Sequence, residues 1–127
     1  MSNWCYVTGS VRVRGERDWD EVFGKECLWE SPEEVWDDRK KHPDDYMPMG
    51  SEGSLHKSVV HHDEGYTVSI GGNLRDVWGV EDIELWFSEC CHELEPEQAV
   101  CEIDCGYMGY RLLTWNGERV VSRKERE

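Results

Sequence analysis

The segment from residue 80 to residue 94, VEDIELWFSECCHEL, constrains the fold more than any other part of the sequence. Apolar residues recur in it at steps of three or four, which places them on one side of an α-helix. Most of its acidic residues lie off that side. We therefore predict an amphipathic helix whose apolar stripe consists of Val80, Ile83, Trp86 or Phe87, Cys90 and Leu94.

Other segments alternate between apolar and polar residues with the period of a β-strand. The run 3–13 is predicted to be a half-buried strand, and a second alternating run, QAVCEIDC, follows Pro96. Two further strand-like runs are joined at Asp-Glu-Gly, and Asn116-Gly117 separates two apolar runs near the end, so each pair is predicted to form a hairpin. The residues expected to face inward are Cys5, Val7, Val11, Val13, Tyr66, Val68, Ile70, Ala99, Cys101, Ile103 and Cys105.

Two shorter helices are expected between the first strand and the first hairpin. Asp18 is three residues before Glu21, which is the spacing of a capping box, and Gly24 is expected to end that helical turn. In SPEEVWDDRKKHP, Ser31 is predicted to cap a helix that Pro43 stops. Its few apolar residues predict a helix that lies shallowly on the surface.

The predicted order is strand, helix, strand, strand, helix, strand, followed by a C-terminal hairpin. We interpret this order as an α+β fold of the ferredoxin-like βαββαβ plan, an antiparallel sheet with helices on one face. The length of 127 residues suits one domain, so residues 1–127 are taken as a single domain.

Four of the six cysteines, together with a histidine, lie between residues 88 and 107. Cys90 and Cys91 are adjacent on the predicted helix and diverge by about 100°, which disfavours a shared metal ion. Cys101 and Cys105 are separated by roughly 13 Å along a strand, too far for two ligands of one zinc ion. Cys5 is expected near Cys101 or Cys105, but without a bond in a reducing compartment. We therefore predict free cysteines in the core, with no metal, no cofactor and no catalytic residue.

The formal net charge is −14, and each half of the sequence contributes −7. The folded surface is therefore expected to be acidic nearly all round, to repel nucleic acid and anionic lipid, and to attract basic proteins. We find neither an apolar run of about 18 residues nor a secretion signal, so we expect a cytoplasmic protein without a membrane span. The sequence does not indicate an oligomeric state.

The stretch SPEEVWDDRKKHPDDYMPM combines acidic residues with aromatic and methionine side chains. Charges that steer an approaching protein and rings that become buried against it are typical of a protein-binding surface. We predict that it binds a partner through Glu33, Glu34, Trp36, Asp37, Asp38, Asp44, Asp45 and Tyr46.

Two glycine-containing stretches, Gly50–Ser54 and Gly71–Arg75, are the candidate small-ligand sites, because glycine-rich loops present backbone donors to anions. Neither has the lysine and the spacing of a phosphate-binding loop. His61 and His62 are adjacent on a predicted strand, so only one of them can point into a given site.

In its small size and overall acidity, the chain resembles the anti-defence proteins that phages and other mobile elements use, many anti-CRISPR proteins among them. The resemblance implies a non-enzymatic inhibitor that occludes the basic groove of a nucleic-acid-handling partner, in the manner of a DNA mimic. It carries over no residue. The alternatives are a nucleotide-binding or sequestering protein and an immunity protein against a basic toxin nuclease.

Overall fold

The computed structural model describes residues 3–16, 20–27, 30–48, 50, 54–75 and 80–125. Its elements follow one another along the chain as β1 (Trp4–Arg14), α1 (Asp20–Phe23), α2 (Glu33–Lys41), the 3₁₀ turn η1 (Pro43–Asp45), β2 (His56–His62), β3 (Gly65–Arg75), α3 (Val80–Leu94), β4 (Gln98–Asp104), the 3₁₀ turn η2 (Gly106–Met108), β5 (Tyr110–Trp115) and β6 (Val120–Arg123).

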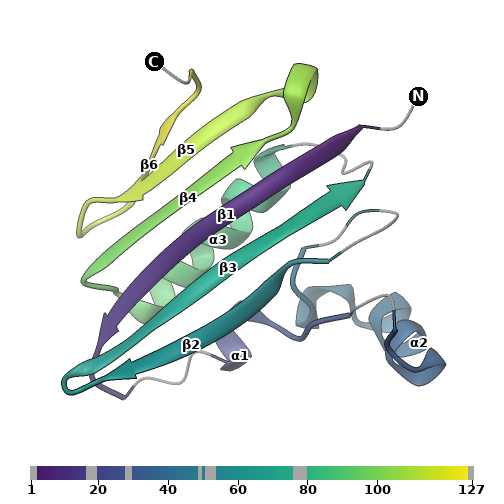
Figure 1. Cartoon of the computed structure of the whole chain (residues 1–127), viewed down its shortest axis with the longest axis horizontal. Helices are drawn as coiled ribbons and strands as arrows, with labels where there is room; N and C mark the ends of the chain where they lie inside the picture. The colour runs from purple at the N-terminus through teal and green to yellow at the C-terminus, as the bar shows by residue number, and fades with distance from the viewer. Residues whose placement is uncertain are drawn as a thin grey trace.

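The strands form one six-stranded sheet in the order β2-β3-β1-β4-β5-β6, and every neighbouring pair is antiparallel. β1 lies at the centre, between β3 and β4, and α3 crosses the sheet on the far side of the view in Figure 1. Both predicted hairpins are present, as β2-β3 and β5-β6. None of the helices in the described part of the chain is long and apolar enough to cross a membrane.

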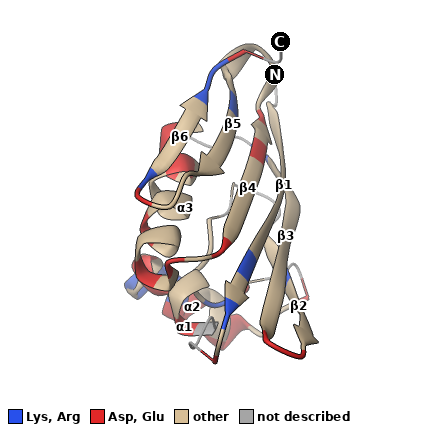
Figure 2. Cartoon of the chain, turned by 90° about the vertical axis from the view of Figure 1, so that its left-hand side faces the viewer, with Lys and Arg blue, Asp and Glu red and all other residues tan. Residues whose placement is uncertain are grey.

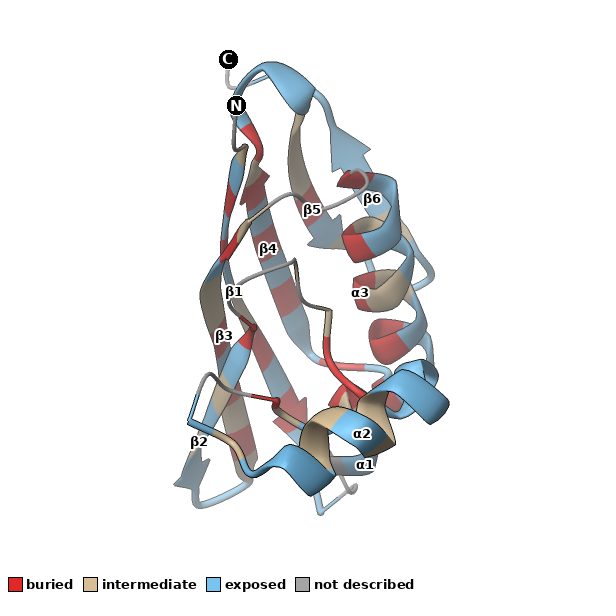
Figure 3. Ribbon diagram, turned by 90° about the vertical axis from the view of Figure 1, so that its right-hand side faces the viewer, coloured by how far each residue is buried: buried red, intermediate tan, exposed pale blue. Residues whose placement is uncertain are grey.

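The α+β class and the antiparallel sheet are confirmed, whereas the ferredoxin-like plan is not. The C-terminal hairpin is not a separate addition, because β5 pairs with β4 and extends the sheet to six strands. The helical layer also differs from the expectation. α1 has four residues, and α2 lies beside the β2 side of the sheet with no buried residue among those described (Figures 1 and 3).

The inner face of the sheet and the apolar stripe of α3 form the core (Figure 3). Alternate residues of the strands are buried, as their two-residue period predicts. All the residues predicted to face inward are at most 4% exposed. On α3 the buried position is Phe87, while the Trp86 side chain is half-buried.

The outer face of the sheet has no helix over it among the described elements (Figures 1 and 2). Its residues are the other half of each alternating strand, such as Tyr6, Ser10 and Arg12 on β1. We call this surface the open face. It is the side that Figure 1 turns toward the reader.

The helix predicted after Ser31 is α2, but its N-cap is Pro32, with no side-chain capping bond, so the prediction of a Ser31 cap is wrong. The end at Lys41, just before Pro43, is as expected. α1 ends before Gly24, whose φ of 97° suits glycine at a helix C-terminus. The predicted cap Asp18 lies outside the described residues.

The prediction that all cysteines are free is wrong for two of them. Cys5 and Cys105 form a disulfide with a Cα–Cα distance of 4.0 Å. Tyr6 pairs with Asp104 in the β1-β4 register, so Cys5 and Cys105 are the next opposite positions on neighbouring strands. The bond closes a loop across a sequence separation of 100 residues, which in the chain-entropy picture stabilises a fold by about 4–5 kcal/mol. Cys27, Cys90, Cys91 and Cys101 are free and buried.

Candidate binding surfaces

A hollow of about 880 Å³ lies between α1, η1 and the start of β2. Its wall contains four carboxylates and two lysines. The lining residues are Glu21, Gly24, Lys25, Glu26, Asp44, Asp45 and Lys57.

A second hollow of about 450 Å³ continues from the first, because Glu21, Gly24 and Asp44 belong to both walls. It lies against α3 and adds apolar surface from the half-buried Val22 and Trp86, with the buried Phe23 beneath them. The Trp86 indole Nε1–H donates to the Phe23 carbonyl oxygen at 3.1 Å, and the two rings are 6.0 Å apart. These contacts fix α1 against α3. We call the combined surface the acidic groove; its acids are Glu21, Glu26, Asp44, Asp45, Glu89 and Glu93.

The acidic groove carries a net charge of −4, from six carboxylates and two lysines, with His92 counted as neutral. Both lysines are already engaged within the protein. Lys25 Nζ lies 3.8 Å from Asp38 Oδ2 and 5.6 Å from the centre of the Tyr46 ring. The Lys57 Nζ donates to the Gly24 carbonyl oxygen, and the Lys57 backbone N–H donates to Glu26 Oε1 at 2.8 Å. The groove therefore presents a negative potential to an approaching basic group.

The predicted partner-binding residues are partly exposed and partly packed into the fold. Asp44 and Asp45 lie in the acidic groove, and the acids of the first part of α2, Glu33, Glu34 and Asp37, are exposed beside it. Trp36 and Asp38 are half-buried. Tyr46 is 7% exposed, so its ring belongs to the fold of this corner and is not open to a partner.

Tyr46 holds the corner together through Asp38. Its hydroxyl donates to Asp38 Oδ2 at 2.7 Å, and Lys25 and Tyr46 form a parallel β-bridge. The hydrogen bond to Asp38 raises the pKa of Tyr46 to about 12. The same hydrogen bond, with a smaller contribution from Lys25, holds the pKa of Asp38 below its usual value. Asp38 thus stabilises the corner as an anion.

Sequence reasoning missed the groove residues that come from α1, β2 and α3. Glu89 and Glu93 are four residues apart and lie off the apolar stripe of α3, which is a signal that the sequence contains. Their approach to Asp44 depends on how η1 and α3 meet around α1, and no local pattern reports that arrangement.

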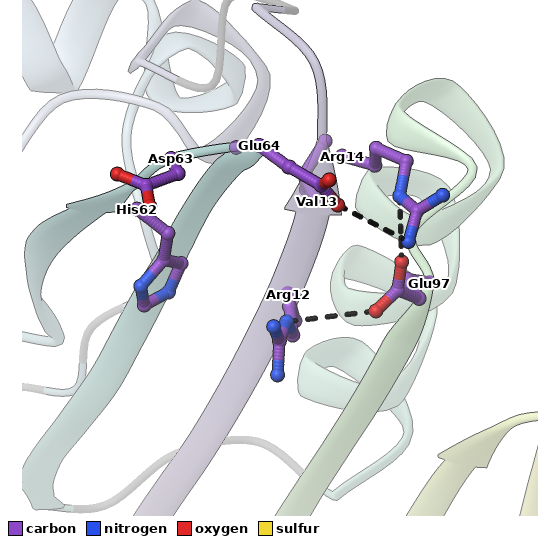
Figure 4. A pocket seen from close by; sticks show the side chains of 8 residues that line it. Arg12, Val13, Arg14, His62, Asp63, Glu64 and Glu97 are labelled. Atoms are coloured by element: carbon purple, nitrogen blue, oxygen red, sulfur yellow. Dashed lines mark ion pairs between the residues drawn. The ribbon is translucent and has the colours of Figure 1, made fainter.

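A third hollow, of about 320 Å³, lies at the end of β1 beside the β2-β3 turn (Figure 4). Two arginines from the open face converge here on one carboxylate. Glu97 Oε1 lies 3.5 Å from Arg12 Nε, and Glu97 Oε2 lies 3.1 Å from Arg14 Nε. On the other side of Arg14, Glu64 Oε2 lies 3.6 Å from Arg14 Nη2. Their charges are balanced by these acids, so the hollow is an ion-pair cluster that ties three chain segments together.

The free thiols on α3 and β4 are poorly suited to nucleophilic chemistry. Burial raises the pKa of Cys91 and of Cys101 to about 12, and it raises the pKa of Cys90 further. A thiol must ionise to attack or to bind a metal, so these side chains behave as small apolar residues. Within the described residues, no three histidines, cysteines or carboxylates are grouped as a metal site requires.

Of the two glycine-containing stretches, the structure describes only Gly71–Arg75 in full. Gly71–Arg75 is the end of β3 and pairs with Trp4–Thr8 of β1, so it is part of the sheet and not a loop. In the other stretch, residues 51–53 lie outside the described part of the chain. His61 and His62 are both exposed, and the ring of His62 contacts the Thr67 hydroxyl at 2.6 Å.

The fold and the groove define the class of protein only as an α+β protein with an acidic groove beside its sheet. Comparison with known proteins adds no family, since no family model, curated protein or solved structure matches the chain.

Proposed function

We propose that the protein is a non-enzymatic inhibitor that uses its acidic side to occlude a basic, nucleic-acid-handling protein, in the manner of an anti-CRISPR protein or DNA mimic. The observation that carries the proposal is the acidic groove. Its six carboxylates come from α1, η1, α3 and the segment after Gly24, and they outnumber its two lysines, both of which already have partners within the protein. Such a surface steers a basic partner and places carboxylates where phosphates would lie.

The exposed acids of α2 extend this surface. Glu33, Glu34 and Asp37 lie on a helix that packs next to η1, so they can widen the contact beyond the groove. Trp36 offers a partly exposed ring at the same place. Aromatic residues surrounded by charge are typical of residues that dominate protein–protein binding.

Charge reversal of the groove tests the proposal. We expect Glu21→Lys, Asp44→Lys, Asp45→Lys and Glu89→Lys, combined in one variant, to abolish capture of basic nucleic-acid-binding proteins. All four side chains are exposed, so the fold should survive. Asp38 is left unchanged, because Tyr46 depends on it. Binding is measured by biolayer interferometry between about 0.05 M and about 0.5 M NaCl, where the screening length falls roughly threefold.

A matched variant controls for total charge. Glu16, Asp63, Glu118 and Glu125 are also exposed, and lysine at these four positions changes the net charge by the same amount. This control variant should still bind the basic partner protein. Equal loss of binding in both variants, or wild-type binding that is indifferent to salt, would contradict a groove-centred site.

Three finer points belong to the same proposal. The adjacency β2-β3-β1-β4 supports a ferredoxin-like arrangement of the first four strands, with β5 and β6 as an extension. The inhibitor would act in the cytoplasm, which is the host cytosol if a phage encodes it. The Cys5–Cys105 disulfide weighs against that location, because such bonds are rare in reducing compartments.

A further inference from the structure

The open face is a continuous surface contributed by all six strands. The register of the strands identifies its members, since residues that pair directly share a face. Small side chains lie next to one another across β2, β3 and β1, among them Ser58, Ser69, Gly71, Thr8 and Ser10. Larger residues make up much of the remaining surface. They include Trp4, Tyr6, Arg12, Arg14, Val60, His62, Arg75, Val100, Glu102, Asp104, Tyr110, Leu112, Val121 and Arg123.

Exposed apolar side chains are concentrated on this face. Eight large apolar residues are exposed in the described part of the chain, and five of them belong to the open face: Trp4, Tyr6, Val60, Val100 and Val121. Single exposed apolar residues need no explanation, but several of them on one uncovered face of a sheet indicate an interaction site.

The open face also differs from the rest of the molecule in charge. Of the strand residues on this face, four are arginines and two are acids, Glu102 and Asp104. Counting the rim acids Glu64 and Glu97, which bind Arg12 and Arg14, gives four positive and four negative charges. The face is therefore close to neutral on a chain whose net charge is −14. Figure 2 shows many of the acidic segments on α1, α2 and α3, away from this surface.

We propose that the open face binds a second copy of this chain, so that two sheets pack face to face in a symmetric dimer. Six strands span roughly 24 Å across the sheet, and seven residues of strand span roughly 24 Å along it. Side chains add to that area, so each copy would bury about 600–800 Å² and the pair about 1,200–1,600 Å². This total is within the range of stable interfaces.

The charge distribution favours a second copy of the chain over a nucleic acid as the partner of the open face. Face-to-face docking brings together the near-neutral surfaces and leaves both acidic sides pointing outward, where their repulsion is weakest. A nucleic acid would meet the repulsion of the whole chain. If the strands of the two copies run in opposite directions, Arg12 and Arg14 of one lie near Trp4 and Tyr6 of the other. Guanidinium groups stack well on aromatic rings.

Light scattering coupled to size exclusion tests the proposal on the full chain. We expect a mass of about twice 14.9 kDa. Association should strengthen as NaCl rises from about 0.05 M to about 0.5 M, because salt screens the repulsion between two acidic chains. That direction is opposite to the salt response expected of the acidic groove. A mass of 14.9 kDa at every salt concentration, with protein up to about 1 mM, would overturn the proposal.

Two substitutions locate the interface. Val100 and Thr114 are cross-strand neighbours near the middle of the open face. Val100→Glu and Thr114→Glu should each shift the protein to a monomer, with a circular dichroism spectrum close to that of the wild type. Leu85→Glu is the matched control, because Leu85 is 61% exposed on α3, off the open face. A dimer that survives both open-face variants, or one that Leu85→Glu dissociates, would refute docking through this face.

Discussion

The two sides of the sheet differ in composition and in burial although they are built from the same strands. The inner side is apolar, is covered by α3 and includes the Cys5–Cys105 disulfide. The open face is made of small polar residues, exposed rings and arginines. The acids that give the chain its charge of −14 lie largely on neither side of the sheet, but on the helices, the turns and the connections.

This comparison corrects the expectation of a surface that is acidic nearly all round. Two halves of equal charge in the sequence do not imply equal charge on the faces of the fold, because each strand divides its residues between two sides. The difference is the basis of the two proposals. We propose that the acidic groove binds a basic partner and that the open face binds a second copy of the same chain.

The largest expected effect contrasts the two faces on one strand. Ile103 is fully buried on β4, whereas Val100 is 38% exposed on the open face. We expect Ile103→Ala to lower the free energy of unfolding by about 2–5 kcal/mol, because it leaves a cavity in the core. Val100→Ala should change it by about 0.5 kcal/mol or less under conditions where the protein is a monomer.

Urea unfolding at low protein concentration measures the change in the free energy of unfolding that each substitution causes. If Ile103→Ala and Val100→Ala lowered the free energy of unfolding equally, β4 would not have one covered and one open side. A large loss for Val100→Ala that grows with protein concentration would instead report the dimer, because association adds to apparent stability.

A smaller effect concerns the acidic corner and its dependence on pH. The pKa of Asp38 is lowered in the folded state, so its stabilising contribution is present above its ordinary pKa and is lost as pH falls through the folded value. The pKa of Tyr46 is raised to about 12, so its contribution is present below pH 10 and is lost as pH rises toward 12.

Tyr46→Phe removes the hydrogen bond that causes both pKa shifts. We expect a small decrease in melting temperature at neutral pH and a weaker loss of stability at both pH extremes than in the wild type. Tyr107→Phe is the control, since Tyr107 is 80% exposed. Identical pH profiles of wild type and Tyr46→Phe would contradict the role given to the Asp38–Tyr46 pair.

Local periodicity predicted most of the elements. The alternation in β1 and β4 and the three- and four-residue spacing in α3 identified the buried residues, because burial on one side is what those periods record. The hairpin at Asn116-Gly117 followed from turn chemistry, and Gly117 has a φ of 99°. These features depend on a few neighbouring residues, so the sequence alone contains them.

Features that depend on distant segments were not predictable in the same way. The disulfide requires the register of β1 against β4, which brings Cys5 opposite Cys105. The acidic groove requires α1, η1 and α3 to meet. Tyr46 was expected on the surface because acids surround it in the sequence, yet its hydroxyl is bound to Asp38 and its ring is buried.

The most direct test of the account is an NMR titration of the ¹⁵N-labelled protein with a short oligoarginine peptide, which serves as a basic probe. The account predicts shifts at Glu21, Asp44 and Glu89 and at the Trp86 indole, which weaken as salt is added, while Ser10 and Ser69 on the open face stay unchanged. Shifts centred on the open face, or shifts that salt does not weaken, would contradict the claim that the acidic side is the one that meets a basic partner.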